Sequence, residues 1–313
     1  MPRHLLEPTR ENLHGHFSPD LPPVLTIDAG DEVEFRTLDA GWHLARWQAP
    51  GVKGAVFEPR RERLDAGHAL NGPVYVRGAE PASTLAVEIV SLRTGDWGWT
   101  GAGEVETPVN RALGVAGRDR QWLLWDLKAD AGTGTDQYGH SVSLRPFLGV
   151  MGLAPAASGV HSTAPPRRTG GNIDCRELVA GSTLYLPVEV AGGLFSTGDG
   201  HATQGDGEVS GTAIECPMES AVLRFTVHPD LHLTTPRATT PAGELTFGFA
   251  DTLDEAMKAA LCDMVEVMRQ RFDVSRSEAL ALASVVVDLR VTQVVNGVVG
   301  VHALLPPDAI SLQ

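Results

Sequence analysis

Short runs of alternating apolar and polar residues, separated by glycines and prolines, fill the chain up to about residue 250. The clearest runs lie at 33–38, 85–90, 184–190 and 221–227. Alternation of this kind places successive side chains on opposite faces of a β-strand. The 34 glycines and 21 prolines among the 313 residues mark turns between such strands. The sequence therefore predicts a mainly β fold.

A helical pattern replaces the alternation after residue 251. Thr252 with Glu255 and Ser275 with Glu278 each form a capping box, which predicts two helices, the second ending near Val286. Apolar residues recur at helical spacing after the first box, and we expect them to pack in the core rather than bind a cofactor: Met257, Ala260, Leu261, Met264, Val265 and Met268.

A last strand pair is expected at Leu289–Val295 and Val298–Leu304, with Asn296-Gly297 as a two-residue hairpin turn. We thus expect a β-rich domain over residues 1–250 that contains the functional site. Residues 251–313 are expected to form a helix–helix–hairpin portion of α+β character packed on that domain.

Composition limits the partners and the compartment. The net charge of −14 argues against nucleic acid and anionic membrane, because both require basic patches. No apolar run reaches membrane-spanning length, and the first residues carry no apolar signal core. The widely spaced cysteines Cys175, Cys216 and Cys262 form neither a metal-finger pattern nor a disulfide framework. We expect a soluble cytoplasmic protein, which we also expect to form a homo-oligomer, a dimer or larger.

Two stretches, 93–119 and 154–172, lack clear periodicity and are predicted to be loops. Loops of this length inside a compact domain are often lids or site-building segments.

Residues Gly198–Glu208 carry three carboxylates, one imidazole and one amide among four glycines. So many glycines exclude a regular helix, and apolar residues flank the segment on both sides. Asp199 and His201 are two positions apart, so on a strand both would reach one ion. Asp206 and Glu208 repeat this spacing and provide a candidate ligand or general base. A solvated Gly/Asp loop is the alternative interpretation.

Other candidate residues lie outside this segment. Glu215 stands in an apolar setting, where a carboxylate is either paired or has a raised pKa. Asp174 follows Gly170-Gly171-Asn172-Ile173 and is either an Asx-turn residue or a site carboxylate, which Asn172 could orient. His14 and His16 form a His-x-His pair, an arrangement that binds metal on a strand, although ordinary surface histidines are commoner. Asp39, His43 and His68 are weaker candidates to line a cleft.

Four blocks of the sequence resemble the acetamidase/formamidase family. The signature block is Phe195–Glu208 with Gly211–Glu215, and the others are Asn71–Pro81, Pro165–Cys175 with Ala180–Val188, and Asp288–Val295. They occur in family order and span most of the chain. One difference is Asp39-Ala40-Gly41-Trp42-His43, where family members often carry a polar, acid-containing stretch. Trp42 and His43 could reshape the pocket toward a larger or aromatic amide.

The resemblance implies a β-sandwich-like core and metal-dependent hydrolysis of a short primary amide, similar to formamide or acetamide, to a carboxylate and ammonia. With the resemblance, Asp174 joins Asp199 and His201 as a candidate metal ligand, and the His-x-His pattern adds His14 and His16 to the candidate ligands. Glu208, Asp206 and Glu215 are the candidate catalytic carboxylates. The expected cofactor is a divalent metal, zinc first and calcium as a further ion.

Three alternatives stay open at this point. A non-catalytic β-sandwich module could use the same carboxylates to bind calcium, although histidine is a poor calcium ligand. An esterase or cyclic-amide hydrolase would share the metal site and differ in the pocket. Cys175 or Cys216 could act as a nucleophile if a cation stabilised the thiolate. Serine chemistry is disfavoured, because the chain lacks a Gly-x-Ser-x-Gly motif and none of its three lysines lies in a Gly/Ser-rich motif.

Overall fold

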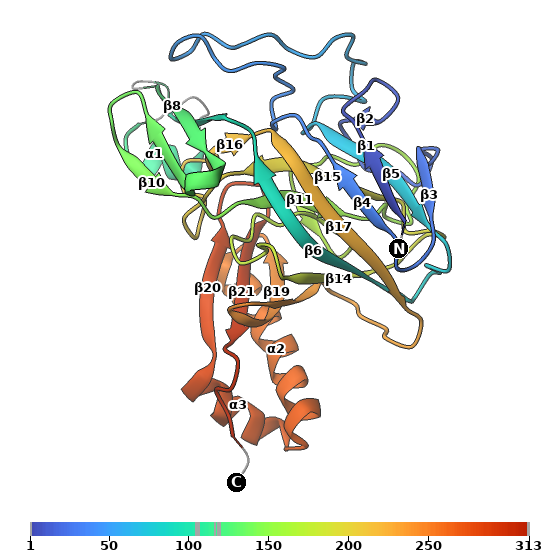
Figure 1. The fold of residues 1–313 in the computed structure, drawn as a ribbon. Helices are drawn as coiled ribbons and strands as arrows, with labels where there is room; N and C mark the ends of the chain where they lie inside the picture. Colours follow the sequence, from blue (N-terminus) through green and yellow to red (C-terminus); the bar gives the residue numbers. More distant parts are fainter. Residues whose placement is uncertain (1, 104–106, 116, 118–119, 312–313) are drawn as a thin grey trace.

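Two large β-sheets and a C-terminal helical layer make up the computed structural model, which describes residues 2–103, 107–115, 117 and 120–311 (Figure 1). Within these residues the first sheet has nine strands. Their spatial order is β1 (Arg3–Leu6), β4 (Glu32–Phe35), β17 (Met218–His228), β6 (Thr84–Thr94), β14 (Thr183–Pro187), β18 (Arg237–Thr240), β19 (Gly243–Ala250), β21 (Val299–Leu305) and β20 (Asp288–Gln293).

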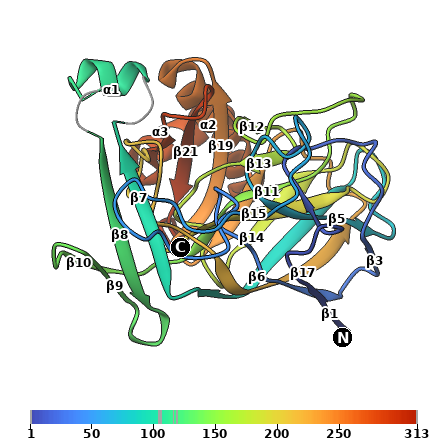
Figure 2. The same cartoon turned by 90° about the horizontal axis from the view of Figure 1, so that it is seen from above.

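The second sheet has twelve strands in the described part of the chain. Nine follow one path: β10 (Ser141–Ser143), β9 (Thr133–Asp136), β8 (Gln121–Lys128), β7 (Trp97–Ala102), β16 (Glu215–Cys216), β15 (Phe195–His201), β11 (Phe147–Gly152), β13 (Gly170–Asn172) and β12 (Pro166–Arg167). The other three join through β5 (Leu70–Val76), which pairs with β15, β2 (Leu13–His14) and β3 (Leu25–Ile27). The green strands β7–β10 extend along one side of the molecule (Figure 2).

The main core lies between the two sheets. Buried side chains of the first sheet, such as Phe35, Val87 and Phe225, form one cluster with Leu148 and Phe195 of the second sheet. The predicted mainly β fold with a sandwich-like core is confirmed. No helix in the described residues is long and apolar enough to cross a membrane.

The C-terminal helices begin at the predicted capping boxes. Thr252 caps α2 (Leu253–Phe272), and its hydroxyl accepts a hydrogen bond from the backbone N–H of Glu255. Ser275 caps α3 (Arg276–Val286) in the same way. The buried face of α2, including Met264 and Met268, packs in one cluster with residues of α3 and β21. The methionines are therefore core residues, as predicted. Shorter helical segments are α1 (Pro108–Ala112) and η1 (Ala129–Ala131).

The C-terminal hairpin differs from its prediction. Strand β20 ends at Gln293 and β21 begins at Val299, so the connection is longer than a two-residue turn. The Gln293 side-chain oxygen accepts hydrogen bonds from the backbone N–H groups of Val295 and Asn296, which stabilises the wider loop. Because β21 pairs with β19, the hairpin continues the first sheet. The domain division at residue 250 stays a prediction.

The two predicted loops contain strands. Strand β7 occupies Trp97–Ala102, and the short strands β12 and β13 lie within 154–172. Gly98 and Gly101 interrupt the apolar alternation of β7 in the sequence. Both positions require glycine, because a Cβ at Gly98 would lie 2.7 Å from Ile214 and one at Gly101 would lie 2.5 Å from the Trp122 ring. Residues 104–106, 116, 118 and 119 of the first predicted loop lie outside the described residues.

Close backbone packing joins α2 to the first sheet at Gly248. A Cβ at this position of β19 would lie 1.9 Å from the Ala256 carbonyl oxygen and 2.7 Å from the Ala260 nitrogen. We expect Gly248→Ala to lower the free energy of unfolding by about 3 kcal/mol, because the rigid helix backbone has to shift. Denaturant unfolding measures this change, and an unaltered midpoint would contradict the packing.

Candidate functional site

One histidine and four carboxylates gather where the strands of the second sheet meet. Asp199 and His201 lie on β15, Glu215 lies on β16, Asp174 follows β13, and Glu208 lies on the loop between β15 and β16. All five residues are buried, and the most exposed is Glu208 at 7%. Such a concentration of buried charge requires compensation by a cation or by protons.

Strand pairing fixes the position of the imidazole. His201 pairs with Glu215 of β16 on one side and with Phe147 of β11 on the other. The Phe147 ring meets the imidazole edge-on, with 5.0 Å between the ring centroids. The His201 Nε2 atom lies 3.4 Å from Asp199 Oδ1 and 3.3 Å from Glu215 Oε2.

Gln204 sets the tautomer of His201. Its side-chain nitrogen donates to the Asp174 carbonyl oxygen at 2.8 Å, which turns its side-chain oxygen toward His201 Nδ1 at 3.0 Å. This oxygen can only accept, so Nδ1 carries a hydrogen and Nε2 is the ring nitrogen that faces the carboxylates. A second partner of this kind is typical of metal-binding histidines.

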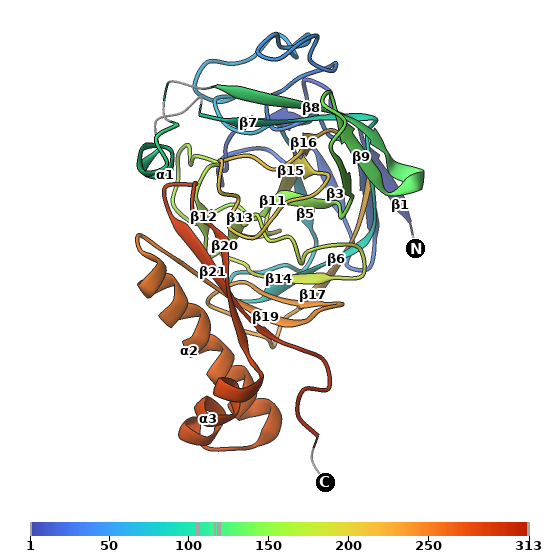
Figure 3. The same ribbon diagram turned by 90° about the vertical axis from the view of Figure 1, so that its left-hand side faces the viewer.

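A glycine, Gly149 of β11, leaves the space in which the carboxylates of Asp174 and Asp199 converge. A Cβ at Gly149 of β11 would lie 2.4 Å from Asp199 Oδ2 and 2.6 Å from Asp174 Oδ1. The C-terminal hairpin loop contributes to the same place, because the Asn296 side-chain N–H donates to Asp174 Oδ2 at 2.5 Å. Figure 3 shows the β20–β21 hairpin extending toward β12 and β13.

Three of the carboxylates stand on unusual backbone. The φ angles of Asp174, Asp199 and Glu208 are 52°, 59° and 47°, in the left-handed region that non-glycine residues rarely adopt. Such conformations persist only where surrounding structure imposes them, and they concentrate at functional sites.

Crowding raises the pKa of most carboxylates in the cluster. Burial, reinforced by the charge of Asp199, raises the pKa of Asp174 to about 6 and that of Glu215 to about 7. Burial and the charge of Asp174 raise the pKa of Glu208 well above its ordinary value. Burial opposes a charged His201, yet the carboxylates of Glu215 and Asp199 raise its pKa well above the ordinary value. A divalent cation would relieve this repulsion.

The donor set fits such a cation. Two groups have ligand atoms within 4.8 Å of one another, Asp174 with Asp199 and His201, and His201 with Glu208 and Glu215. The atoms Asp174 Oδ1, Glu208 Oε2 and Glu215 Oε2 are buried and lack a hydrogen-bond partner. Tetrahedral ligands of zinc at about 2.0–2.1 Å stand about 3.3 Å apart, close to the separations around His201 Nε2.

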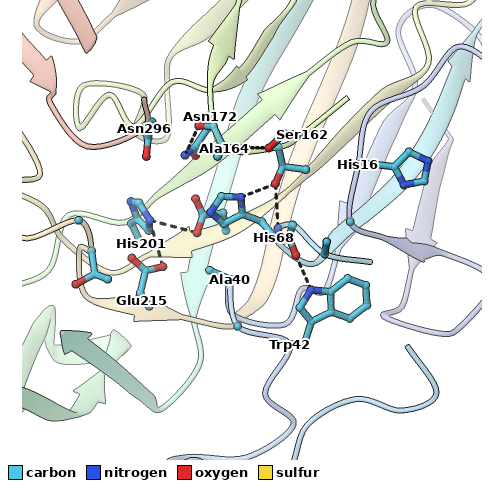
Figure 4. A pocket seen from close by; sticks show the side chains of 18 of the residues that line it. His16, Ala40, Trp42, His68, Ser162, Ala164, Asn172, His201, Glu215 and Asn296 are labelled. Carbon is cyan, nitrogen blue, oxygen red and sulfur yellow. Dashed lines mark hydrogen bonds and ion pairs between the residues drawn. The ribbon is translucent and has the colours of Figure 1, made fainter. Parts of the chain in front are cut away.

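A cavity of about 710 Å³ leads to the cluster, and four of its members line it: Asp199, His201, Glu208 and Glu215. Figure 4 shows His201 and Glu215 at one side of the cavity, and Trp42 and His16 at the other. Asn172 and Asn296 also line it. The side-chain oxygen of Asn172 is buried without a partner, so it can accept a hydrogen bond from a bound molecule.

Comparison with known proteins assigns the chain to a family. The model of the Acetamidase/Formamidase family matches residues 3–161 and 156–241. The chain belongs to the acetamidase/formamidase family.

Individual members of the family are moderately similar. The formamidase of Methylophilus methylotrophus is 27% identical over 249 residues, which are 63% of this chain and 60% of that protein. The acetamidase of Mycolicibacterium smegmatis is 25% identical over 256 residues, with shares of 63% and 61%. This chain thus matches about 60% of the length of these relatives. The acetamidase structure from Bacillus halodurans has a TM-score of 0.83 at 28% identity, covering 96% of this chain and 97% of that chain.

The structure brings together five of the residues proposed from the sequence, namely Asp174, Asp199, His201, Glu208 and Glu215. Asp206 is exposed on the same loop, where the positive charges of Arg176 and Arg290 act on it. It does not line the cavity, so the structure does not bring it to the cluster.

The two N-terminal histidines lie apart from the cluster. His16 lines the cavity. Both ring nitrogens of His14 are engaged, Nδ1 with the His16 carbonyl oxygen at 2.7 Å and Nε2 with the Ser196 hydroxyl at 3.0 Å. Burial lowers the pKa of His14 to about 3, so its ring is neutral.

Weaker candidates occupy different positions. His68 lines the cavity, and its Nδ1 interacts with the Thr163 hydroxyl at 2.7 Å. Asp39 and His43 form a buried pair at 2.7 Å, and neither lines the cavity. Asn172 donates to the Ala164 carbonyl, so the expectation that it orients Asp174 is wrong and Asn296 does so instead.

Both candidate nucleophilic cysteines are buried in the main core. Burial raises the pKa of Cys175 and of Cys216 well above the ordinary value. A thiolate is therefore unfavourable at either position, which argues against cysteine catalysis.

Metal content can test the cluster directly. We expect His201→Ala, which removes the imidazole, and Gly149→Ala, which pushes Asp174 and Asp199 apart, each to lose most of the bound metal while the protein stays folded. Gly205→Ala is the matched control, because a Cβ there meets nothing within 4 Å. Metal analysis by mass spectrometry with circular dichroism measures both properties. Full metal occupancy in His201→Ala and Gly149→Ala would contradict the assignment.

Proposed function

We propose that this chain hydrolyses the C–N bond of a linear primary amide, releasing a carboxylate and ammonia, with a divalent metal ion held by His201 and neighbouring carboxylates. The observation that carries the proposal is the position of His201 Nε2, 3.4 Å from Asp199 and 3.3 Å from Glu215, in a cluster where Asp174, Glu208 and Glu215 each have a buried oxygen without a hydrogen-bond partner. The family membership supports the same reaction type.

His201, Asp199 and Asp174 are the proposed ligands, and Glu215 adds a carboxylate oxygen 3.3 Å from His201 Nε2. A divalent ion in this position would polarise the amide carbonyl and lower the pKa of a water molecule. Zinc suits the mixed nitrogen and oxygen donors better than calcium, which prefers oxygen ligands.

Glu208 is the proposed general base. It lines the cavity, and its Oε2 has no hydrogen-bond partner. By contrast, Glu215 Oε1 already accepts a hydrogen bond from the Ala213 N–H at 2.9 Å, and its Oε2 faces His201. Glu208 takes a proton from the attacking water and delivers it to the nitrogen that leaves as ammonia. The Asn172 side-chain oxygen is buried without a partner, and we propose that it accepts a hydrogen bond from the substrate amide. The homo-oligomeric state and the cytoplasmic location stay predictions.

The base role predicts a specific loss. Glu208→Gln keeps the shape of the side chain and removes the charge, so turnover should fall by about 100-fold or more while metal content stays the same. Steady-state ammonia release, paired with metal analysis, measures both quantities. Undiminished turnover would exclude the role, and loss of the metal would make Glu208 a ligand.

Substrate class is tested with a panel of formamide, acetamide, propionamide and benzamide. We expect ammonia release that a chelator abolishes and added zinc restores. One methylene changes the specificity constant modestly, so short amides should differ by no more than about 100-fold. If the metal-loaded protein hydrolyses only an ester or a cyclic amide, the proposal is wrong. If it hydrolyses none of these compounds, a non-catalytic binding module becomes the better account.

A further inference from the structure

Three cations line the same cavity as the acidic cluster. Lys53, Arg60 and Arg63 belong to the segment between β4 and β5, which forms the long blue loop at the top of Figure 1. The chain as a whole has 25 lysines and arginines against 39 acidic residues. In such an acidic protein, a group of cations at one cavity favours the binding of an anionic group there. We call these three residues the basic rim.

The basic rim is not paired with acidic side chains. Within the described residues, none of its three members has a carboxylate oxygen within the 4.0 Å of the ion pairs seen elsewhere. The neighbouring Arg10 and Arg61 differ, because both pair with the buried Asp65, at 2.8 and 3.0 Å, and neither lines the cavity.

Aromatic rings support two of the rim cations. The Arg60 guanidinium lies 4.8 Å from the centroid of the Trp42 ring, and its side chain donates to the Asp65 carbonyl oxygen. The Lys53 ammonium lies 5.6 Å from the Trp47 ring. Such contacts hold a cation in place without neutralising it, so its charge stays available to a ligand.

The cavity is larger than formamide or acetamide requires. Its volume of about 710 Å³ lies in the range of sites for ligands with many more atoms. Trp42 and Trp99 line it, and the Trp99 indole N–H donates to the buried Asp39 at 2.7 Å, which fixes this wall. The sequence difference at 40–43 therefore contributes Trp42 to an aromatic wall of this cavity.

We propose that the preferred substrate of this site is a primary amide whose acyl chain ends in a carboxylate, and that the basic rim binds this carboxylate while the amide reaches the cluster. This inference rests on the proposed amide hydrolysis. Arginine and lysine donate charge-assisted hydrogen bonds to carboxylates, which stabilise one orientation of the substrate and accelerate its encounter with the cavity.

The test compares two amides of the same shape. Succinamate carries a terminal carboxylate, and isocaproamide replaces that carboxylate with an uncharged isopropyl group. With the metal-loaded full chain we expect kcat/KM to be higher for succinamate, and the ratio to fall as salt rises. We expect Arg63→Gln and Lys53→Gln each to lower this ratio by about tenfold. Arg77→Gln is the control, because it removes an equal charge from a remote ion pair with Asp28.

A binding measurement tests carboxylate binding at the basic rim independently of amide hydrolysis. Calorimetric titration with succinate should give an affinity that falls in Arg63→Gln and not in Arg77→Gln. If uncharged amides are hydrolysed but the ratio is below one and unchanged in the rim variants, the basic rim proposal is overturned and the amidase proposal stands. If no amide is hydrolysed while succinate binding depends on Arg63, the amidase proposal fails and the anion site stands.

Discussion

Repulsion among four buried carboxylates around one imidazole is the constraint on which the rest of the site depends. Asp174, Asp199, Glu208 and Glu215 stand in a space where the absence of a side chain at Gly149 leaves room for oxygen atoms. Isolated buried charges are too costly for a folded protein to retain without a partner. The ligand atoms of the cluster could together hold a metal ion, and we propose that such a cation compensates the buried charge.

The two sheets supply the rigidity that holds these charges together. His201 is fixed by β11 and β16 on its two sides and by Gln204 at Nδ1. The first sheet contributes through its C-terminal edge, because the loop after β20 carries Asn296 to Asp174. The backbone of this same hairpin pairs with the loop that carries Glu208, through Gly207 and Gln293. A site of this kind can keep left-handed backbone at Asp174, Asp199 and Glu208 because both sheets enclose it.

Local signals in the sequence predicted local structure. The capping boxes at Thr252 and Ser275 require only neighbouring residues, and both helices begin where predicted. The composition of Gly198–Glu208 likewise identified a polar segment of unusual chemistry, because ligand types and glycines occur together over a few residues.

Contacts between distant segments could not be predicted in this way. Asn296 appeared to be a simple turn residue, yet its partner Asp174 lies 122 positions away. Gly149 lies in an apolar run, and its importance depends on the carboxylates of residues 174 and 199. Strand β7 was missed because Gly98 and Gly101 interrupt its pattern where Ile214 and Trp122 pack against it. In each case the role of the residue depends on a contact with a residue distant in the sequence, which the spacing of residue types does not predict.

The central claim is that the cluster is a metal centre built on His201 Nε2. A crystal structure of the protein grown with zinc, with anomalous data collected at the zinc absorption edge, tests it most directly. The account predicts an anomalous peak about 2.0–2.1 Å from His201 Nε2, within bonding distance of carboxylate oxygens of the cluster. Zinc bound only elsewhere, with His201 Nε2 hydrogen-bonded to Glu215 and no ion beside it, would contradict the account.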